Sequence, residues 1–521
     1  MHRATAPQPV RTNESLTLLT WNVAAINNNP FEYWLTYDED PNYNKLMSAV
    51  EEFIESPGDK DVAISQVFTQ DMFDELKALM KTQSWNNLDT VEVHWHRYYK
   101  DRKIISEFMK DKMIGSKRLT SMPDRVTNTI NTLQGPVYRP TVINMYEGKL
   151  DSVDAWFTEW KKFMFEHQVA LGGAEPKKVC QLLPKIQKAK YPAITEEEEE
   201  ISVPLQTVLL AVFDAVLVHM LNTVAPDTWM VIKSKLCEKL SKKKMDRTLA
   251  ILQDTYKTAD IMFLQEVSAG FIETASKSNL SKVYHVVSPL DLDQSRDQNS
   301  IVLLNRSLFP DPNITEVTAT VLEKLKGQKV PIAAGDLLVL TCQDRQSQSY
   351  FMASFHGDTN GLATVPILSA VDATANEKPD HVFLFGLDAN TYEKGNSTLL
   401  GVGPFASEFV KRGLTSCFGD NPDPSNYTTF NARTYLQPQL NKACKSSDKR
   451  VGADINPKDF ILLRKNQYTV TKVWKDNTGQ QEYKEGMVFP TPDFPSDHGI
   501  VAAVCTKVAT PMTPPTSPTK N

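Results

Sequence analysis

The sequence is poor in cysteine and has no paired cysteines. Six cysteines are scattered over 521 residues, without a C-x-x-C pair and without histidines at the spacing of zinc ligands. This pattern argues against a zinc-binding module and against the disulfide framework of a small secreted domain. We therefore expect a reduced, intracellular protein, with the cytoplasm favoured and the nucleus left open.

Long hydrophobic runs are also missing. Residues 1–15 contain no apolar stretch of the kind that forms a secretory signal. No uncharged apolar run reaches the roughly 18 residues of a membrane-spanning helix. The nearest candidate, residues 201–224, contains Asp214 and His219, which predicts a buried helix. We expect no transmembrane segment.

An excess of positive charge is absent as well. The chain has 57 Lys and Arg against 63 Asp and Glu, which gives a formal net charge of −6. This balance argues against a broadly basic nucleic-acid coat but leaves a local basic groove open. With 41% hydrophobic and 23% charged residues, the composition is that of an ordinary globular protein, and the length allows more than one domain.

The pattern along the chain changes twice. Residues 1–14 look like a disordered lead, and the apolar, β-rich residues 16–23 predict a core strand. Residues 31–240 are mostly helical in pattern, with apolar residues at helical spacing in 45–55 and at Trp156, Trp160 and Phe163. Thr195 and Glu198 have the spacing of a capping box, so the acidic run 196–200 predicts a solvated first turn.

From about residue 241, strands alternate with helices. A helix is predicted over 246–258, and it leads into a strand at 261–264. Further strands are predicted at 300–304, 337–341, 350–355, 381–385, 460–463 and 500–504. Residues 507–521 are rich in Pro and Thr and predict a disordered tail. Residues 61–68 echo residues 260–267, but Val67 stands where the later copy has Glu266.

Polar side chains follow or precede several of these apolar strands. The segments are Trp21-Asn22, Gln265-Glu266, Phe355-His356-Gly357, Leu387-Asp388-Ala389-Asn390, Lys458-Asp459-Phe460 and Ser496-Asp497-His498. Residues at strand ends are well placed to converge on one pocket. The set contains four carboxylates, two histidines and two asparagines but no cysteine, a combination of ligands that suits Mg²⁺, Mn²⁺ or Ca²⁺ better than zinc.

The order of these segments resembles the endonuclease/exonuclease/phosphatase (DNase I-like) superfamily. The matching stretches read TWNV, FLQEV, SFHGD, FGLDAN, KDFIL and PSDHGIV, and the resemblance covers residues 15–26 and about 245–506. It implies an α/β fold, a four-layer sandwich of two packed β-sheets flanked by helices. It also implies hydrolysis of phosphodiesters with Mg²⁺ or Mn²⁺.

The resemblance also implies a role for each residue. Glu266, with Asn22 and Asp497, would hold the metal. His498 would be the general base, or an imidazolium facing the phosphoryl group, oriented by Asp459. The attacking water would be positioned or deprotonated by Asp388, and phosphate oxygens would be contacted by Asn390 and His356. A metal and cationic or neutral donors stabilise the charge that develops on phosphoryl oxygens.

Several features depart from the superfamily pattern. Leu387 separates Gly386 from Asp388, and Ala24 stands where abasic-site endonucleases carry an acid, which weakens that reading. The Cys-Asp-Arg segment of inositol-polyphosphate 5-phosphatases is absent near Asp459. A core helix and loop need only a few tens of residues, whereas roughly 240 separate Asn22 from Glu266, so that about 210 are inserted.

The predicted organisation is therefore a phosphoesterase domain with an insertion. Residues 15–30 supply its first core strand, 31–240 form a large, mainly helical insertion, and 241–506 complete it. Within the insertion, residues 94–103 mix basic and aromatic side chains, which could stack bases, although an amphipathic surface helix is favoured. Residues 241–244 (SKKK) are interpreted as a solvated helix start.

The favoured function is a metal-dependent, nuclease-like phosphoesterase that acts on a phosphodiester substrate, with nucleic acid the favoured class. A phosphatase or a phospholipase C-like enzyme acting on a small or lipid phosphoester is the alternative. A non-catalytic scaffold that binds a protein partner through the insertion ranks below both.

Overall fold

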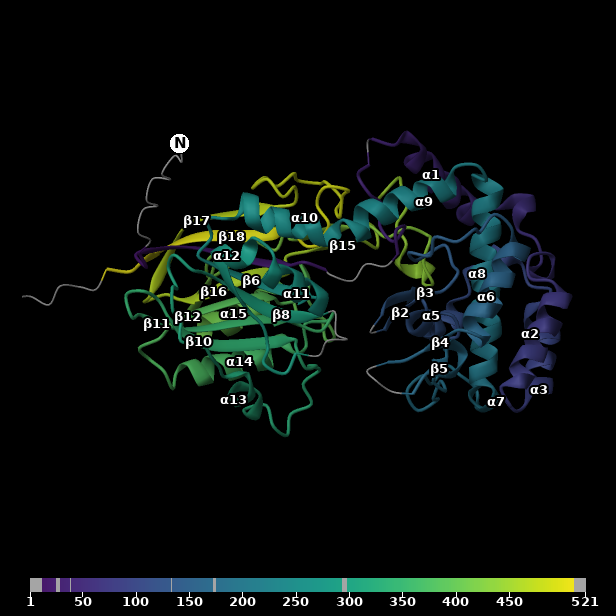
Figure 1. Ribbon diagram of the computed structural model, residues 1–521, viewed down its shortest axis with the longest axis horizontal. Helices are drawn as coiled ribbons and strands as arrows, with labels where there is room; N and C mark the ends of the chain where they lie inside the picture. The colour runs from purple at the N-terminus through teal and green to yellow at the C-terminus, as the bar shows by residue number, and fades with distance from the viewer. Residues whose placement is uncertain are drawn as a thin grey trace, which may run out of the picture.

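The computed structural model describes residues 12–24, 29–37, 39–132, 134–171, 175–292 and 298–509. In this part of the chain, a β-sandwich with flanking helices lies beside a mainly helical unit (Figure 1). Most of the predicted disordered lead and tail, residues 1–11 and 510–521, lies outside the described residues. Asn13, which we placed in the lead, is buried, and its side-chain amide donates to Asp344 at 2.8 Å.

One six-stranded sheet combines strands from both ends of the chain. In spatial order its strands are β17 (Tyr468–Asp476), β18 (Ile500–Lys507), β1 (Ser15–Asn22), β6 (Ile261–Val267), β8 (Asn299–Asn305) and β7 (Tyr284–Val287). β1 and β6 are parallel, and the other neighbours are antiparallel. The first strand of the chain thus lies beside the strand that follows the helical segment.

The second six-stranded sheet comes from residues 315–464. Its strands are β13 (Leu414–Ser416), β16 (Asp459–Arg464), β12 (Val382–Asp388), β11 (Ser349–His356), β10 (Leu337–Gln343) and β9 (Thr315–Glu316). Here β11 and β12 are the parallel pair, and the other pairs are antiparallel. The prediction of a mixed α/β chain with two β-sheets is confirmed.

The alternating side chains of the strands build the layers of the sandwich. Residues facing the other sheet form one buried apolar cluster that includes Leu18, Phe263, Met352, Leu384 and Ile461. The opposite face of the first sheet packs on α10 (Lys244–Ala250), α11 (Ala269–Lys277) and α12 (Leu280–Val283). The opposite face of the second sheet packs on α13 (Thr318–Glu323), α14 (Thr364–Ala375) and α15 (Val402–Lys411). Period-two alternation thereby gives each strand one face toward its partner sheet and one toward helices.

Glycine is required at position 386, where the second sheet faces Phe263 of the first. A Cβ atom at Gly386 would lie only 2.3 Å from Cγ of Phe263 in the opposite sheet. Because successive residues of a strand alternate between faces, Leu387 then points to the outer helices and Asp388 returns to the inner face. Leu387 therefore occupies a helix-facing position between two residues that face the other sheet.

The helical unit has its own buried core. Its helices are α1 (Pro41–Glu55), α2 (Gln70–Thr82), α3 (Leu88–His94), α4 (Lys112–Ser116), α5 (Ser121–Thr127), α6 (Val153–Phe165), α7 (Glu196–Glu200), α8 (Ser202–Val224) and α9 (Trp229–Cys237). Two small hairpins complete it, β2 (Thr129–Thr132) with β3 (Gly135–Tyr138) and β4 (Gln168–Val169) with β5 (Lys177–Lys178). Helix α8 is long and apolar enough to cross a membrane, but 78% of its most apolar window is buried inside this unit.

Three local predictions for the helical unit have clear outcomes. The capping box is present, since Thr195 and Glu198 exchange hydrogen bonds with each other's backbone N–H. The solvated first turn is wrong for Glu198, which is 5% exposed and accepts a 2.6 Å bond from Lys117. In the 94–103 stretch Trp95 is buried and Tyr98 is exposed, as in an amphipathic helix.

Residues 61–68, the segment that echoes 260–267, contain a short 3₁₀ turn at Ile64–Gln66 and, though described throughout, no strand.

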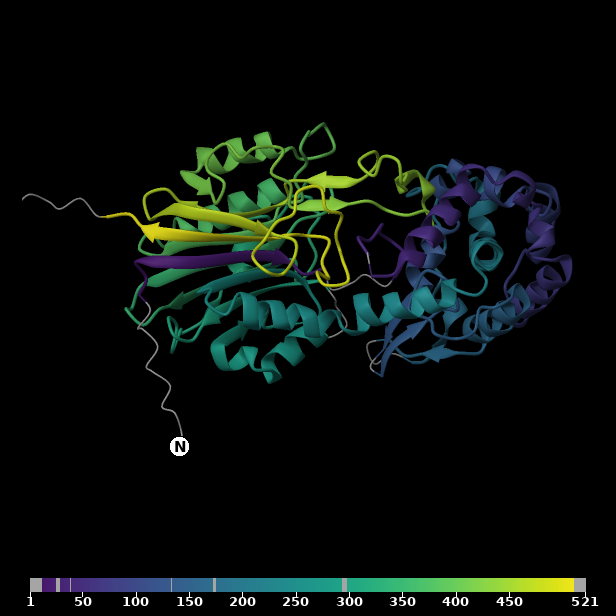
Figure 2. The same ribbon diagram turned by 90° about the horizontal axis from the view of Figure 1, so that it is seen from above.

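Long connections join the helical unit to the sandwich (Figure 2). Helix α9 continues through a π-helical turn at Glu238–Lys242 into α10. The segment between β14 (Thr429–Asn431) and β15 (Asp454–Asn456) leaves the sandwich, and its Tyr435 and Leu436 enter the core of the helical unit. Strand β1 points toward this unit (Figure 2). The boundaries proposed for the insertion, 31–240, stay a prediction.

A buried ion pair offers a test of the core of the helical unit. Asp214 is fully buried and accepts bonds from Arg139 at 2.8 Å, Thr141 at 2.7 Å and Trp160 at 3.0 Å. We expect Asp214→Ala to lower the free energy of unfolding by about 3–5 kcal/mol, because it leaves a buried guanidinium short of a partner. Urea unfolding followed by tryptophan fluorescence measures this.

The matched control removes an exposed ion pair on α6. Glu159 and Lys162, at 3.0 Å, are both about half exposed, so Glu159→Ala should change stability by no more than about 0.5 kcal/mol. If Asp214→Ala is as mild as this control, the ion pair does not hold the helical core together.

Candidate active site

The polar strand ends of both sheets meet at one end of the sandwich. In the second sheet, Asp388 at the end of β12 lies directly opposite His356 of β11 and Asp459 of β16. In the first sheet, Asn22 ends β1 beside the end of β6. The carboxyl ends of parallel strands share an edge, and their antiparallel neighbours begin there, which is why residues far apart in sequence converge.

Glu266 is aimed into the site by an irregularity in its strand. The register between β6 and β8 shifts between Leu264 and Val267, and Glu266 has the left-handed φ of 49°. A β-bulge of this kind re-aims one side chain. Ala24 and Asn390 also have φ near this value, at 46° and 47°. Such left-handed non-glycine residues are costly and cluster at functional sites.

An asparagine bridges carboxylates from different sheets. The Asn22 amide donates to Glu266 Oε1 at 3.1 Å and to Asp388 Oδ2 at 2.9 Å. Its Oδ1 accepts from the Ala24 N–H at 2.9 Å. In this arrangement Asn22 holds two carboxylates together, and its role as a metal ligand stays a prediction.

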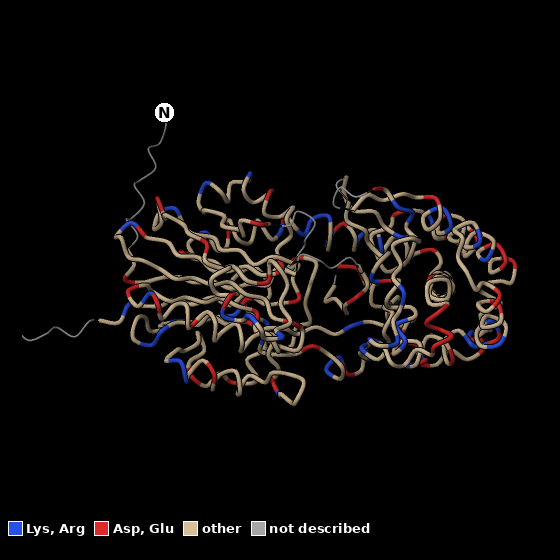
Figure 3. Tube along the Cα trace, turned by 90° about the horizontal axis from the view of Figure 1, so that it is seen from below, with Lys and Arg blue, Asp and Glu red and all other residues tan. Residues whose placement is uncertain are grey.

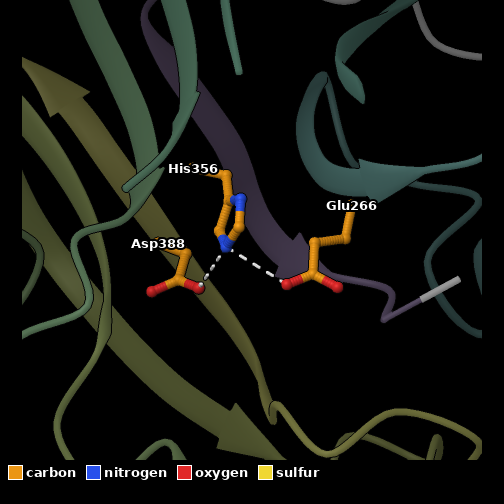
Figure 4. A group of neighbouring side chains, drawn as sticks. All are labelled: Glu266, His356 and Asp388. Atoms are coloured by element: carbon orange, nitrogen blue, oxygen red, sulfur yellow. Dashed lines mark ion pairs between the residues drawn. The ribbon is translucent and has the colours of Figure 1, made fainter. Parts of the chain in front are cut away.

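His356 lies between the same two carboxylates (Figure 4). Its Nε2 is 3.1 Å from Glu266 Oε1 and 3.8 Å from Asp388 Oδ2. Burial by itself would lower the pKa of His356, but the charges of Glu266 and then Asp388 outweigh it and raise the pKa to about 9. Burial would likewise raise the pKa of Glu266, yet the His356 charge and hydrogen bond bring it to about 2. The pair is therefore ionised at neutral pH.

His498 is held by a second carboxylate. Its Nδ1 lies 2.9 Å from Asp459 Oδ2, and Thr428 donates to the same oxygen at 2.6 Å. The other ring nitrogen, Nε2, is 3.7 Å from Asp388 Oδ2. Burial opposes protonation, but the negative charges of Asp459 and Asp388 raise the pKa of His498 well above its usual value. The geometry keeps Nε2 directed toward the carboxylate cluster.

Asn390 lies at the edge of this cluster. Its amide donates to the Gly357 carbonyl at 2.9 Å, and its Oδ1 is 3.3 Å from Nζ of Lys458. Lys458, a buried lysine that sequence reasoning did not single out, also bonds Asp454 at 2.7 Å. Charge from Asp454 and Asp388 raises its pKa despite burial. A fixed cation thus lies beside the predicted phosphate contact.

Asp497 faces a cavity of about 210 Å³ that Glu266 also lines. Tyr33 donates to Asp497 Oδ2 at 3.0 Å. Lys244 lines the same cavity and contacts the Ala24 carbonyl. The prediction of a solvated helix start is wrong for Lys244, which is only 7% exposed, and burial lowers its pKa to about 8. Nothing in the local pattern of the SKKK run distinguishes this lysine from its neighbours.

The predicted site residues therefore fall into one connected group. Two subsets, Glu266 with His356 and Asp388, and Asp388 with Asp459 and His498, each bring one ligand atom per residue within 4.8 Å of one another. Gln265, also in the FLQEV segment, is instead buried between the sheets and donates to Ser354 at 3.1 Å. The carboxylate donors are hard oxygens, which fits a divalent cation such as Mg²⁺ or Mn²⁺.

Comparisons with known proteins each match part of the chain. A family model described as a domain of unknown function (DUF8234) matches residues 61–234. No curated protein matches the chain.

Solved structures resemble about half of it. Zebrafish (D. rerio) TDP2 complexed with a single-strand DNA product is 14% identical, with a TM-score of 0.32, over 51% of this chain and 93% of that chain. The human Nocturnin catalytic domain with bound sulfate is 13% identical, with a TM-score of 0.32, over 50% and 86%. An endonuclease/exonuclease/phosphatase from Bacteroides vulgatus is 11% identical, with a TM-score of 0.33, over 51% and 91%.

Metal binding tests the donor set directly. We expect Glu266→Gln to weaken binding of Mn²⁺ at least about tenfold, because it removes a charged oxygen donor from the site. Titration of the metal-free protein, followed by calorimetry or by the Mn²⁺ electron paramagnetic resonance signal, measures this.

The matched control is Glu273→Gln, which removes an exposed carboxylate on α11. It should leave Mn²⁺ affinity unchanged. Equal Mn²⁺ affinity of Glu266→Gln and the unaltered protein would contradict the metal assignment.

Proposed function

We propose that this protein is a divalent-metal-dependent phosphoesterase that hydrolyses phosphodiesters by in-line attack of water, with nucleic acid as the favoured substrate class. The observation that carries the proposal is the convergence of Glu266, Asp388, Asp459, His356 and His498 at one end of two packed sheets. Carboxylates, imidazoles and an adjacent cavity are the parts that metal-assisted ester hydrolysis requires.

The chain's own residues divide the work. Glu266 and Asp497, which line one cavity, would hold the metal together with Asn22. When bound, a divalent metal would supply Lewis-acid stabilisation of phosphoryl charge. Oδ1 of Asp388 accepts from the Asn390 N–H at 2.9 Å, and Oδ2 is directed at the cluster of carboxylates and imidazoles. In this position Oδ2 would orient the attacking water.

The imidazoles provide positive charge. His498, oriented by Asp459, donates from Nε2 to a phosphoryl oxygen as an imidazolium, the form favoured by the two carboxylates beside it. His356 and Asn390 contact further phosphate oxygens. Lys244 adds a cation at the cavity wall.

The proposal also covers the cellular compartment and the range of substrates. We propose a reduced, intracellular setting, which is supported by six buried cysteines, each unpaired. The same chemistry serves small or lipid phosphoesters, so a panel of substrates separates the nuclease from the phosphatase or phospholipase C-like alternative.

That panel is the direct experiment. With Mg²⁺ or Mn²⁺ we expect hydrolysis of DNA or RNA oligonucleotides, and none with Asp388→Ala or Glu266→Gln. His498→Ala should lower turnover by at least about 100-fold, the scale of a lost acid–base group. Full activity in Asp388→Ala would refute the site, whereas hydrolysis confined to phosphoinositides or sphingomyelin would favour the alternative.

The pH–rate profile tests the form of His498. Because Asp459 raises the pKa of His498, the rate should fall as pH rises through that pKa and the imidazolium loses its proton. Asp459→Asn removes this charge, lowers the pKa and moves the alkaline limb to lower pH. Movement of the acidic limb instead would assign His498 as the general base, and a rate that is flat over about pH 5 to 9 would exclude both roles.

A further inference from the structure

A second cavity, of about 330 Å³, adjoins the candidate site. It lies between the helical unit, which contributes Arg118 and Ser121, and the connecting segment 433–442. Glu32 and Arg433 line both this cavity and the one that contains Glu266. These two residues form an ion pair at 2.7 Å, so the cavities are neighbours on either side of one salt bridge.

Positive charge is in excess around this second cavity. Three cations line it, Arg118, Arg433 and Lys442, against two acids, Glu32 and Asp124. Both acids have partners, because Glu32 pairs with Arg433 and Asp124 pairs with the buried Arg139 at 2.7 Å.

Arg118 and Lys442 form no ion pair within the described part of the chain. Partial burial, and then the charges of Arg433 and Arg118, lower the pKa of Lys442. The two acids of the cavity are paired with other cations, so Arg118 and Lys442 are left without an anionic partner among the described residues.

Two donors that belong to residues lining this cavity are unsatisfied. The Ser121 hydroxyl and Nε of Arg118 are buried yet have no hydrogen-bond partner among the described residues. Ser121 itself is only 7% exposed. An unpaired buried donor costs roughly 1–3 kcal/mol, so a hydrogen-bond acceptor at this position would be favoured. Another polar residue of the cavity, Asn128, already donates from its amide to the Ile143 carbonyl at 3.0 Å.

We propose that this cavity is an anion-binding site for a phosphate group, held by Arg118, Lys442 and the Ser121 hydroxyl. Guanidinium, ammonium and hydroxyl donors match the oxygens of a tetrahedral phosphate. Elsewhere Lys and Arg positions are interspersed with Asp and Glu along both units (Figure 3). An anion site is therefore indicated by where Arg118 and Lys442 lie, and not by the net charge of the protein.

The two cavities share Glu32 and Arg433 as a wall, which gives the anion site a role in substrate choice. This step rests on the proposed function. The phosphodiester to be cleaved would lie beside Glu266, and a second phosphate of the same molecule would lie on the other side of the Glu32–Arg433 pair. The substrate class is then a phosphoester with at least two phosphates. An oligonucleotide and an inositol polyphosphate both have this chemistry.

Binding of inorganic phosphate tests the cavity without any hydrolysis. The full chain is titrated with phosphate in EDTA, followed by calorimetry or ³¹P line broadening. Arg118→Gln and Lys442→Met should each weaken binding at least about fivefold. Lys442 is exposed at the end of a short 3₁₀ helix, Leu440–Lys442, so its variant should fold even if Arg118→Gln does not, which circular dichroism checks. Lys326→Met, which removes a lysine 79% exposed on the sandwich, is the matched control.

Hydrolysis then tests the link to the substrate. With a trinucleotide, Arg118→Gln and Lys442→Met should raise KM at least about fivefold with little change in kcat. With bis(4-nitrophenyl) phosphate, which has a single phosphate, both constants should stay unchanged. A parallel assay with an inositol polyphosphate distinguishes the two substrate classes. Only the class whose second phosphate occupies the cavity should show the increase in KM in the two variants.

The outcomes separate the two proposals. Phosphate binding that depends on Arg118 and Lys442 supports the anion site even if no phosphodiester is hydrolysed, in which case the proposed function fails alone. Unaltered phosphate affinity in both variants, or an equal loss in Lys326→Met, overturns the anion site while leaving the catalytic proposal standing. A KM increase that is the same for the single-phosphate ester overturns the role in substrate choice.

Discussion

Three carboxylates crowded beside one another are the constraint on which the rest of this structure depends. Asp388 and Asp459 face each other across adjacent strands, and Asn22 joins Asp388 to Glu266. Like charges at this range repel strongly in a buried setting. The two imidazoles and the Asn22 amide offset that repulsion. Because the compensating groups come from different segments of both sheets and their connections, the charge balance exists only when both sheets are closed together.

The packing between the sheets fixes that closure. Gly386 admits the Phe263 ring, and Gln265 donates to Ser354 across the interface. A larger residue at 386 would push the sheets apart close to the strand ends that form the site, and a densely packed core does not absorb such a shift. The bulge at Glu266 then turns one carboxylate out of an otherwise buried strand. Core packing and site chemistry are thus parts of one arrangement.

The helical unit forms part of the surroundings of the candidate active site. Its core is completed by Tyr435 and Leu436, which belong to the connection between β14 and β15. Tyr33 and Arg433 are adjacent in space through this contact, and both line the cavity beside Asp497. The helical unit and the β14–β15 connection therefore supply walls next to the candidate active site. Substrate choice by such walls, with the chemistry kept on the strand ends, is the usual division of labour in α/β enzymes.

The sequence by itself determined the core strands and the set of polar residues at their ends, because strand periodicity and short motifs are local properties. It also predicted the buried character of α8 and the Thr195 capping box, for the same reason. Only the tertiary structure decided that Lys244 is buried against Ala24, that Asn22 turns its amide toward Asp388, and that Arg433 contacts Tyr33. These features arise from contacts between segments hundreds of residues apart, where burial and neighbouring charge, rather than residue type, set what a side chain does.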